Sequence, residues 1–218
     1  MKKLISLGNN CEVSFQIEKY QGDIDSSLFS WAFTLNDEKF LCALENIDDI
    51  FTHGVHFHMP SDDMFYDEEY DITFHGRTPK DRMFDHEGKI KDQAAYDETL
   101  AELQSRLNHL KEKMKQDFRS DDEKLYLRKV EIWPEADGTF RYERVIDFLQ
   151  RLNLLLERKS PNGSYKLVAV VEKRHLTSAL QALQTDKLLL RTVDYFAPFY
   201  DTKNGADYES WEKIFLSL

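Results

Sequence analysis

Apolar positions along the chain follow two spacings that alternate from one segment to the next. Short apolar runs bounded by turn residues predict buried strands at residues 2–7, 125–132, 165–171 and 188–193. Apolar residues three or four positions apart predict helices at residues 9–20, 36–47, 100–118, 142–156, 176–183 and 207–216. Strands that alternate with helices are typical of right-handed crossovers and a mostly parallel sheet.

We therefore predict an α/β fold, a three-layer sandwich with a mostly parallel central sheet, Rossmann-like or flavodoxin-like. No linker or internal repeat divides the sequence, so residues 1–218 are expected to form a single domain. The least regular part is an insertion at about residues 48–92, where His, Asp, Pro and aromatic residues are scattered. One or two short strands are expected there, including residues 70–74, and residues 28–33 are expected to form a strand or a packed loop.

Composition narrows the choice of partners. The chain has 29 Lys and Arg against 40 Asp and Glu, a formal net charge of −11. Nucleic acids and anionic membranes are bound through clustered cations, so neither is an expected partner. No apolar segment approaches the roughly 20 residues that span a bilayer, and two cysteines are too few for a disulfide framework. We expect a cytoplasmic protein with free thiols and a small-molecule, peptide or glycan substrate; its oligomeric state is not predicted.

Candidate chemistry begins where the first predicted strand ends, because ligands of open α/β sheets bind beyond the carboxyl ends of the strands. Cys11 falls there, in the opening turn of the first helix, with Asn9 as the expected N-cap and Glu12 completing a capping box. Backbone N–H groups and the helix dipole would lower the thiol pKa and could bind an oxyanion. Cys11 is therefore a candidate nucleophile, the alternative being a packing residue. Cys42 lies within an amphipathic helix and is expected in the core.

A nucleophilic thiol needs a base, and the histidines are the candidates. They are His53, His56, His58, His75, His86, His109 and His175. His75 ends the short run at residues 70–74, and His175 follows the strand at residues 165–171. Either could project from a strand end toward a ligand, although a surface or capping histidine is the ordinary alternative.

Cofactor and metal motifs are weak. The H-x2-H-x-H spacing of residues 53–58, with Asp62 and Asp63 nearby, is compatible with zinc ligands, but histidine clusters in loops are usually incidental. Gly8 stands alone, so neither a dinucleotide-binding nor a phosphate-binding glycine motif is present. We expect no metal and no cofactor.

Five segments follow one another along the chain in a suggestive order. They are ISLGNNCEVSFQIEKY, LFSWAF, YDITFHG, YLR and NGADYESWEKIF. Together they resemble a bacterial family of unknown function described as papain-like cysteine peptidases, over residues 5–215. The resemblance implies that Cys11 is the nucleophile and His75 the base, and it matches Arg128, Trp31 and Trp211 to family positions.

One position departs from that pattern. The family has an aspartate before the first tryptophan, where this chain has Ser30. If that aspartate orients the histidine, this chain lacks the third member of a triad. The resemblance predicts a thiol-dependent hydrolase or transferase, peptidase-like.

Two alternatives remain. A nucleophile after the first strand and Asp207 at the start of the last helix are similar to the layout of the Ser-Gly-Asn-His hydrolases. That layout would make the protein an acyltransferase- or esterase-like enzyme acting on a glycan precursor. The other alternative is a non-catalytic binding module that kept the fold and, as Ser30 suggests, lost the chemistry.

The expected substrate-binding residues are Asn9, Asn10, Arg128 and His175. The two asparagines share a loop with Cys11. Arg128 lies in a strand among apolar residues, where it either forms an ion pair or holds a substrate carboxylate or phosphate, which its planar guanidinium suits.

Overall fold

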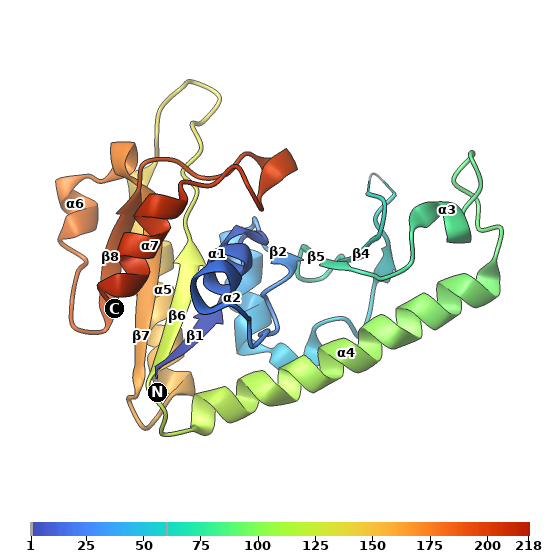
Figure 1. Cartoon of the computed structure of the whole chain (residues 1–218), viewed down its shortest axis with the longest axis horizontal. Coiled ribbons are helices and arrows are strands. Elements are labelled where there is room, and N and C mark those ends of the chain that lie inside the picture. The colour runs from blue at the N-terminus through green and yellow to red at the C-terminus, as the bar shows by residue number, and fades with distance from the viewer. Residues whose placement is uncertain (1, 60) are drawn as a thin grey trace.

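The computed structural model describes residues 2–59 and 61–218, and strands in these residues form two four-stranded sheets (Figure 1). The first sheet is parallel, and its strands in spatial order are β1 (Lys3–Ser6), β6 (Lys124–Lys129), β7 (Tyr165–Glu172) and β8 (Leu188–Val193). The second is antiparallel, and its strands in spatial order are β2 (Ala32–Phe33), β5 (Ile72–His75), β4 (Met64–Asp67) and β3 (Val55–Phe57). The predicted α/β class with a parallel sheet is confirmed.

Helices make up most of the remaining regular structure. The α-helices of the described residues are α1 (Glu12–Gln21), α2 (Asp37–Glu45), α3 (Lys80–Met83), α4 (Gln93–Arg119), α5 (Tyr142–Lys159), α6 (Ser178–Gln181) and α7 (Tyr208–Leu216). Three short 3-10 helices are η1 (Ile47–Asp49), η2 (Lys173–His175) and η3 (Phe199–Asp201). No described helix has the length and apolar character needed to cross a bilayer.

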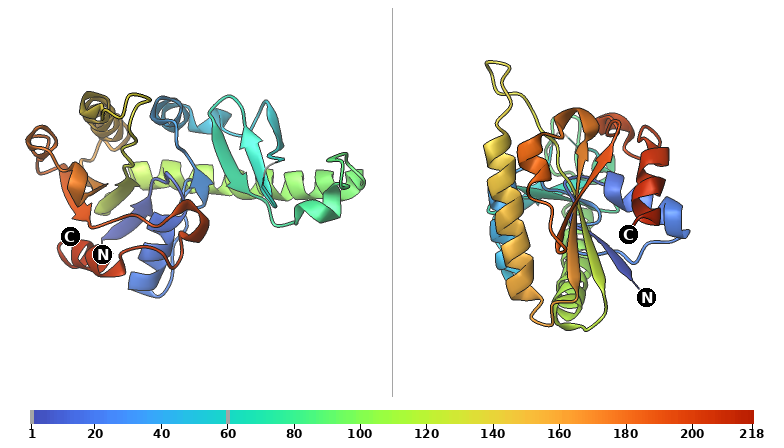
Figure 2. Two further views of the ribbon diagram at one scale, coloured as in Figure 1. Left: turned by 90° about the horizontal axis from the view of Figure 1, so that it is seen from above. Right: turned by 90° about the vertical axis from the view of Figure 1, so that its left-hand side faces the viewer.

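Both faces of the parallel sheet are covered (Figure 2). Helices α1 and α7 contact each other and lie on one face, and α5 lies on the other with α2 and α6 beside it. Successive side chains of a strand alternate between the faces: Leu125 and Leu127 pack with α1 and α7, whereas Tyr126 belongs to the larger core on the opposite side. Burial on both faces is the reason why these strands appear as continuous apolar runs in the sequence.

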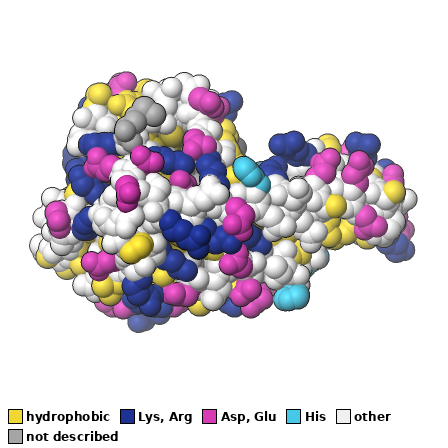
Figure 3. Space-filling model, turned by 90° about the horizontal axis from the view of Figure 1, so that it is seen from below, with side chains coloured by type: hydrophobic (Ala, Val, Ile, Leu, Met, Phe, Trp, Pro, Cys, Tyr) yellow, Lys and Arg dark blue, Asp and Glu magenta, His cyan; other side chains and the backbone are white. Residues whose placement is uncertain are grey.

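Residues 48–92, where one or two short strands are expected, contribute three strands to the antiparallel sheet and form α3. This sheet rests on α4, where Phe65 and Phe74 share a core cluster with Leu103 and Leu107. Helix α4 begins seven residues before the predicted start and runs beneath both sheets (Figure 1). Seen from below, the molecule narrows into an arm with interspersed acidic and basic side chains (Figure 3).

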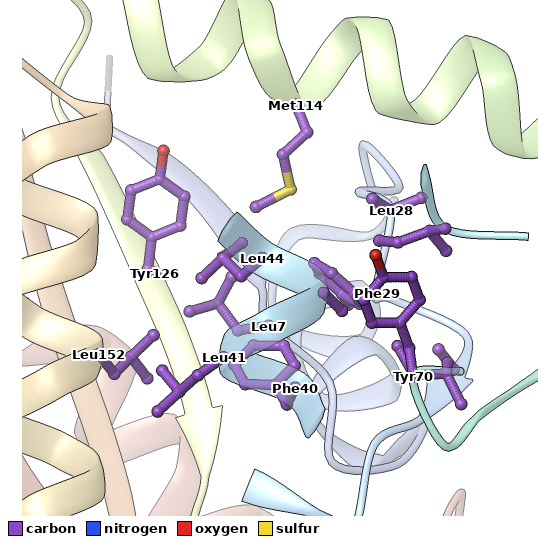
Figure 4. Packing of buried hydrophobic residues seen from close by; sticks show 14 of the residues in the cluster. Leu7, Leu28, Phe29, Phe40, Leu41, Leu44, Tyr70, Met114, Tyr126 and Leu152 are labelled. Atoms are coloured by element: carbon purple, nitrogen blue, oxygen red, sulfur yellow. The ribbon is translucent and has the colours of Figure 1, made fainter. Parts of the chain in front are cut away.

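The order of the parallel strands decides where a site can form. The spatial order of these strands is the same as their order along the sequence. Among the described residues the strand order therefore never reverses, and β1 lies at an edge of the sheet. In doubly wound folds the ligand crevice lies at such a reversal. Here the carboxyl end of β1 faces the antiparallel sheet, and the Thr34 N–H donates to the Asn9 carbonyl at 3.0 Å. Leu7, Leu44 and Tyr126 converge in the core that the two regions share (Figure 4).

Candidate active site

The loop that carries Cys11 has a backbone different from the predicted one. Helix α1 begins at Glu12 with Cys11 as its N-cap, and Asn9 has a φ of 86°, so Asn9 is not the cap. The Asn10 side-chain oxygen accepts the Glu12 N–H at 3.0 Å instead. Gly8, with a φ of 77°, allows the close approach: a Cβ there would lie 3.0 Å from both the Phe29 carbonyl and the Thr34 hydroxyl.

Cys11 lies beside a histidine that a carboxylate orients. Its Sγ is 3.8 Å from Nε2 of His75, and Nδ1 of His75 is 3.0 and 3.1 Å from the two carboxylate oxygens of Asp63. The parallel-sheet region supplies the thiol, and the antiparallel sheet supplies the other two groups. The structure therefore brings together the predicted pair, Cys11 and His75, with a third residue that completes a nucleophile–base–carboxylate arrangement.

Asp63 was considered in the sequence only as a companion to the histidine cluster. It directly precedes Met64, which pairs with His75 in the β4–β5 hairpin, and its carboxylate contacts Nδ1 of His75. The Gly76 N–H donates to the Asp63 carbonyl and closes this end of the hairpin. Ser30, at the position of the family aspartate, instead accepts the Ser27 N–H at 2.8 Å in a buried turn.

A cavity of about 1070 Å³ opens beside Cys11 and His75. It lies between α1, the antiparallel sheet, α4 and the η3 segment. Its apolar wall consists of Phe15, Leu28, Trp31, Phe33, Leu35, Phe74, Leu107, Leu110 and Phe199. Its charged side chains are Asp62, Asp71, Arg77 and Arg106, and the imidazoles of His58 and His75 also line it. This is the size and character of a small-molecule or peptide-segment site.

The thiol is a weaker acid than expected. Burial raises the pKa of Cys11 to about 12, and the negative charge of Asp63 acts in the same direction. Only 5% of Cys11 is exposed, so desolvation opposes the thiolate more than the start of α1 favours it. At neutral pH Cys11 is therefore a protonated thiol. Cys42, expected in the core, is exposed on α2.

Arg128 lies outside the cavity lining and is fully buried. Its guanidinium has no exposed surface and donates to the Leu7 carbonyl at 3.0 Å, the Thr34 hydroxyl at 2.6 Å and the Thr34 carbonyl at 2.8 Å. Asp37 pairs with it at 3.0 Å. The ion-pair alternative describes its surroundings: Arg128 ties the end of β1 to the segment after β2.

The other expected substrate-binding residues also lie outside the cavity lining. Asn9 and Asn10 are buried, and they hold the loop through backbone and capping hydrogen bonds. His175 is buried at the far end of β7, where the Tyr142 hydroxyl is 3.2 Å from Nδ1. A strand end alone did not distinguish a histidine in the core from one at a cavity.

Among the described residues, no group of three or more His, Cys, Asp or Glu side chains is placed to hold a metal ion. His56 approaches Glu68 at 3.4 Å on the exposed edge of the antiparallel sheet, and His58 lines the cavity.

The chain matches no family model, no curated protein and no solved structure in the comparisons with known proteins. What Cys11, His75 and Asp63 can do is therefore inferred from their geometry.

Proposed function

We propose that this protein is a thiol-dependent acyl-transfer enzyme, a hydrolase or transferase, in which Cys11 is the nucleophile, His75 the general base and Asp63 the group that orients His75. The observation that carries the proposal is the pair of contacts on one imidazole: Nε2 at 3.8 Å from the thiol and Nδ1 at 3.0 Å from a carboxylate. A proton acceptor beside a nucleophile, itself fixed by a third group, is the arrangement that covalent catalysis requires.

The reaction follows from these positions. Sγ of Cys11 attacks the substrate carbonyl carbon while its proton passes to Nε2 of His75. The tetrahedral intermediate forms at the start of α1, where N–H groups without helical partners and the positive end of the dipole favour an oxyanion. The bond from carbon to the leaving group then breaks, and that group takes the proton from His75. Water or a second substrate cleaves the resulting thioester, again with His75 as base.

The high pKa of Cys11 bears on this mechanism. A thiol that stays protonated at rest is activated only as His75 takes its proton, so the Cys11–His75 contact and the orientation given by Asp63 become essential. This differs from a site with a preformed thiolate, in which the histidine would contribute less to the attack itself.

The proposal also includes the expected fold type, substrate class, cellular location and family resemblance. The parallel sheet with helices on both faces supports a three-layer sandwich with Rossmann-like crossovers, although β1 at the edge departs from the doubly wound strand order. The net charge of −11 supports a small-molecule, peptide or glycan substrate over nucleic acid, and two free thiols support a cytoplasmic location. The resemblance to papain-like cysteine peptidases remains part of the proposal.

The Ser-Gly-Asn-His layout gains no support from the last helix. The Asp207 carboxylate accepts N–H groups of Asp194 and Ser210 and does not line the cavity. No contact of Asp207 therefore supports a role for it beside Cys11. A non-catalytic binding module is the outcome that the following experiment would reveal.

The test uses a Cys42→Ser background, which leaves Cys11 as the single thiol. The protein is mixed with p-nitrophenyl acetate, butyrate and octanoate, and released p-nitrophenolate and intact mass are followed. We expect a burst of about one p-nitrophenolate per chain and an acyl group on Cys11. Cys11→Ala should abolish the burst, and His75→Asn should slow it by about 10²–10⁴-fold.

The matched control is His109→Asn, since His109 is exposed on α4 and does not line the cavity. This control should acylate at the unaltered rate. Acylation at another residue, or a burst that survives Cys11→Ala, would refute the proposed nucleophile. No acylation by any ester, together with saturable binding of one of them, would favour the binding module.

A further inference from the structure

Two guanidinium groups stand in the cavity wall next to the proposed base. Arg77 follows β5 two residues after His75, and Arg106 reaches from α4 and donates a hydrogen bond to the His75 carbonyl. Among residues 2–59 and 61–218, neither guanidinium lies within salt-bridge distance of a carboxylate, although the chain has 40 acidic residues. This contrasts with Arg128, whose charge is neutralised inside the fold.

The two cations differ in burial, and Arg77 is the exposed one. Arg106 is half-buried, and its pKa is lowered by desolvation and by the positive charge of Arg77, against weaker opposite effects of Glu102 and Asp63. The cavity carboxylates do not neutralise the pair: Asp63 is held by His75, Asp71 accepts the Tyr66 hydroxyl at 2.9 Å, and Asp62 lies exposed at the rim. Two like charges held together at a cavity wall favour an anion between them.

Another part of the cavity lining is aromatic. Phe15 and Trp31 pack edge to face at 5.1 Å, and Phe33 packs against Phe199 at 5.0 Å. Phe199 remains 67% exposed, so this wall offers apolar surface to a ligand rather than burying it within the fold. The cavity therefore combines apolar surface, part of which reaches His75 through Phe33, with the two cations next to His75.

We propose that Arg77 and Arg106 form the specificity subsite of this enzyme, and that the substrate carries a carboxylate or phosphate that they bind while its apolar part lies on the Phe15–Trp31–Phe33–Phe199 wall. The inference rests on the proposed function, because it places the anion relative to the carbonyl that Cys11 attacks. The acidic protein repels anions in bulk, and a local pair of cations overcomes that repulsion at the site.

The first test compares two esters that differ only in charge, p-nitrophenyl glutarate and p-nitrophenyl valerate, in the Cys42→Ser background. The glutaryl group ends in a carboxylate where the valeryl group ends in a methyl. We expect kcat/KM for the glutarate to exceed that for the valerate. Arg106→Gln should reduce the glutarate-to-valerate ratio by about 10–100-fold, and Arg106→Lys should reduce it less because the charge remains.

The ratio separates recognition from positioning. Because Arg106 also holds the His75 carbonyl, losing that support would slow both esters equally and leave the ratio unchanged. Arg82→Gln is the matched control, since Arg82 is exposed on α3 and does not line the cavity. It should leave the ratio at its unaltered value. A ratio that does not respond to Arg77→Gln or Arg106→Gln would overturn the subsite.

The second test needs no catalysis. Glutarate and inorganic phosphate are titrated calorimetrically into the Cys11→Ala protein and into the same protein with Arg106→Gln. Binding of either anion that Arg106→Gln weakens about 10-fold or more supports the subsite and shows which anion it prefers. Binding of neither anion, or binding insensitive to both arginines, overturns it. Failure of both esters to acylate Cys11, with arginine-dependent binding retained, would instead refute the proposed function alone.

Discussion

The two regions that meet at the cavity hold their functional side chains in different ways. In the parallel-sheet region Cys11 is fixed by buried charges: Arg128 ties down its loop, and Glu12, the next residue, pairs with Lys129 at 2.8 Å with neither side chain exposed. In the antiparallel region the side chains of His75 and Asp63 are 34% and 38% exposed and depend on hairpin register. Changes in the first region should therefore reduce stability, whereas changes in the second should mainly reduce reactivity.

Glu12 shows how far the first region extends. Its carboxylate accepts the Trp211 indole N–H and the Ala197 N–H, each at 3.1 Å, and it faces Lys129. Burial raises the pKa of Glu12, and Lys129 and these hydrogen bonds act against that shift. The start of α1 is thereby joined to α7 and to the segment that leads to Phe199 at the cavity wall.

The largest effect on stability is expected from Lys129→Met. The substitution leaves Glu12 and Glu131, both 2.8 Å from the Lys129 ammonium, without their cation. Removing one partner of a buried pair costs about 3–5 kcal/mol, which urea unfolding followed by circular dichroism would measure. The matched control is Lys166→Met, an exposed partner of Glu123 at 3.4 Å, which should change stability by less than about 1 kcal/mol. Equal losses in the two variants would contradict the comparison.

The same contrast explains what the sequence could predict. Strand β8 matches its predicted bounds and β7 ends one residue later, because burial on both faces produces apolar runs. The antiparallel strands have two to four residues of mixed polarity, and their pairing is fixed by packing on α4. Short strands stabilised by distant contacts leave little periodicity to recognise.

The residues of the candidate site also differ in how far the sequence alone predicts them. A strand end and a helix start, which are local in the sequence, predict Cys11, and the ordered segments of the family resemblance add His75. Asp63 becomes a partner of His75 only through the β4–β5 register, which local patterns do not specify. Arg128 and His175 lie outside the cavity lining, because closeness to a strand end does not tell a core position from a cavity wall.

Thiol labelling tests whether burial governs Cys11. A pKa of about 12 against an ordinary value of 9.0 lowers its thiolate fraction at neutral pH by roughly 10³-fold. Iodoacetamide at pH 7.5 with peptide mapping should therefore label the exposed Cys42 first and Cys11 far more slowly. In guanidinium chloride the two should label alike. Faster labelling of native Cys11 would show that the helix start and His75 outweigh desolvation.

Gly8→Ala and Gly22→Ala separate backbone strain from close packing. Both glycines have positive φ, 77° and 81°, and an L-residue there costs about 1–2 kcal/mol. A Cβ at Gly22 meets open space, whereas at Gly8 it meets the Phe29 carbonyl and the Thr34 hydroxyl. Denaturant unfolding should show the larger loss for Gly8→Ala, about 2–3 kcal/mol. Equal losses would show that the loop before Cys11 relaxes without cost.

The smallest expected effect on stability concerns His175, which is buried in the fold and does not line the cavity. Burial lowers its pKa, the nearby Arg174 lowers it further, and Glu172 at 3.7 Å opposes both. Below the ordinary value of about 6.5 the unfolded chain therefore binds more protons than the folded one. The stability contributed by neutral His175 is present above that pH and declines as the pH falls through the folded-state pKa.

Urea unfolding between pH 7.5 and 5 should show a smaller loss of stability toward acid pH for His175→Gln than for the unaltered protein. His109→Gln, at an exposed position on α4, should keep the original slope. An unchanged slope for His175→Gln would mean that the imidazole takes up its proton as readily in the folded chain as in the unfolded one, which would contradict the lowered pKa.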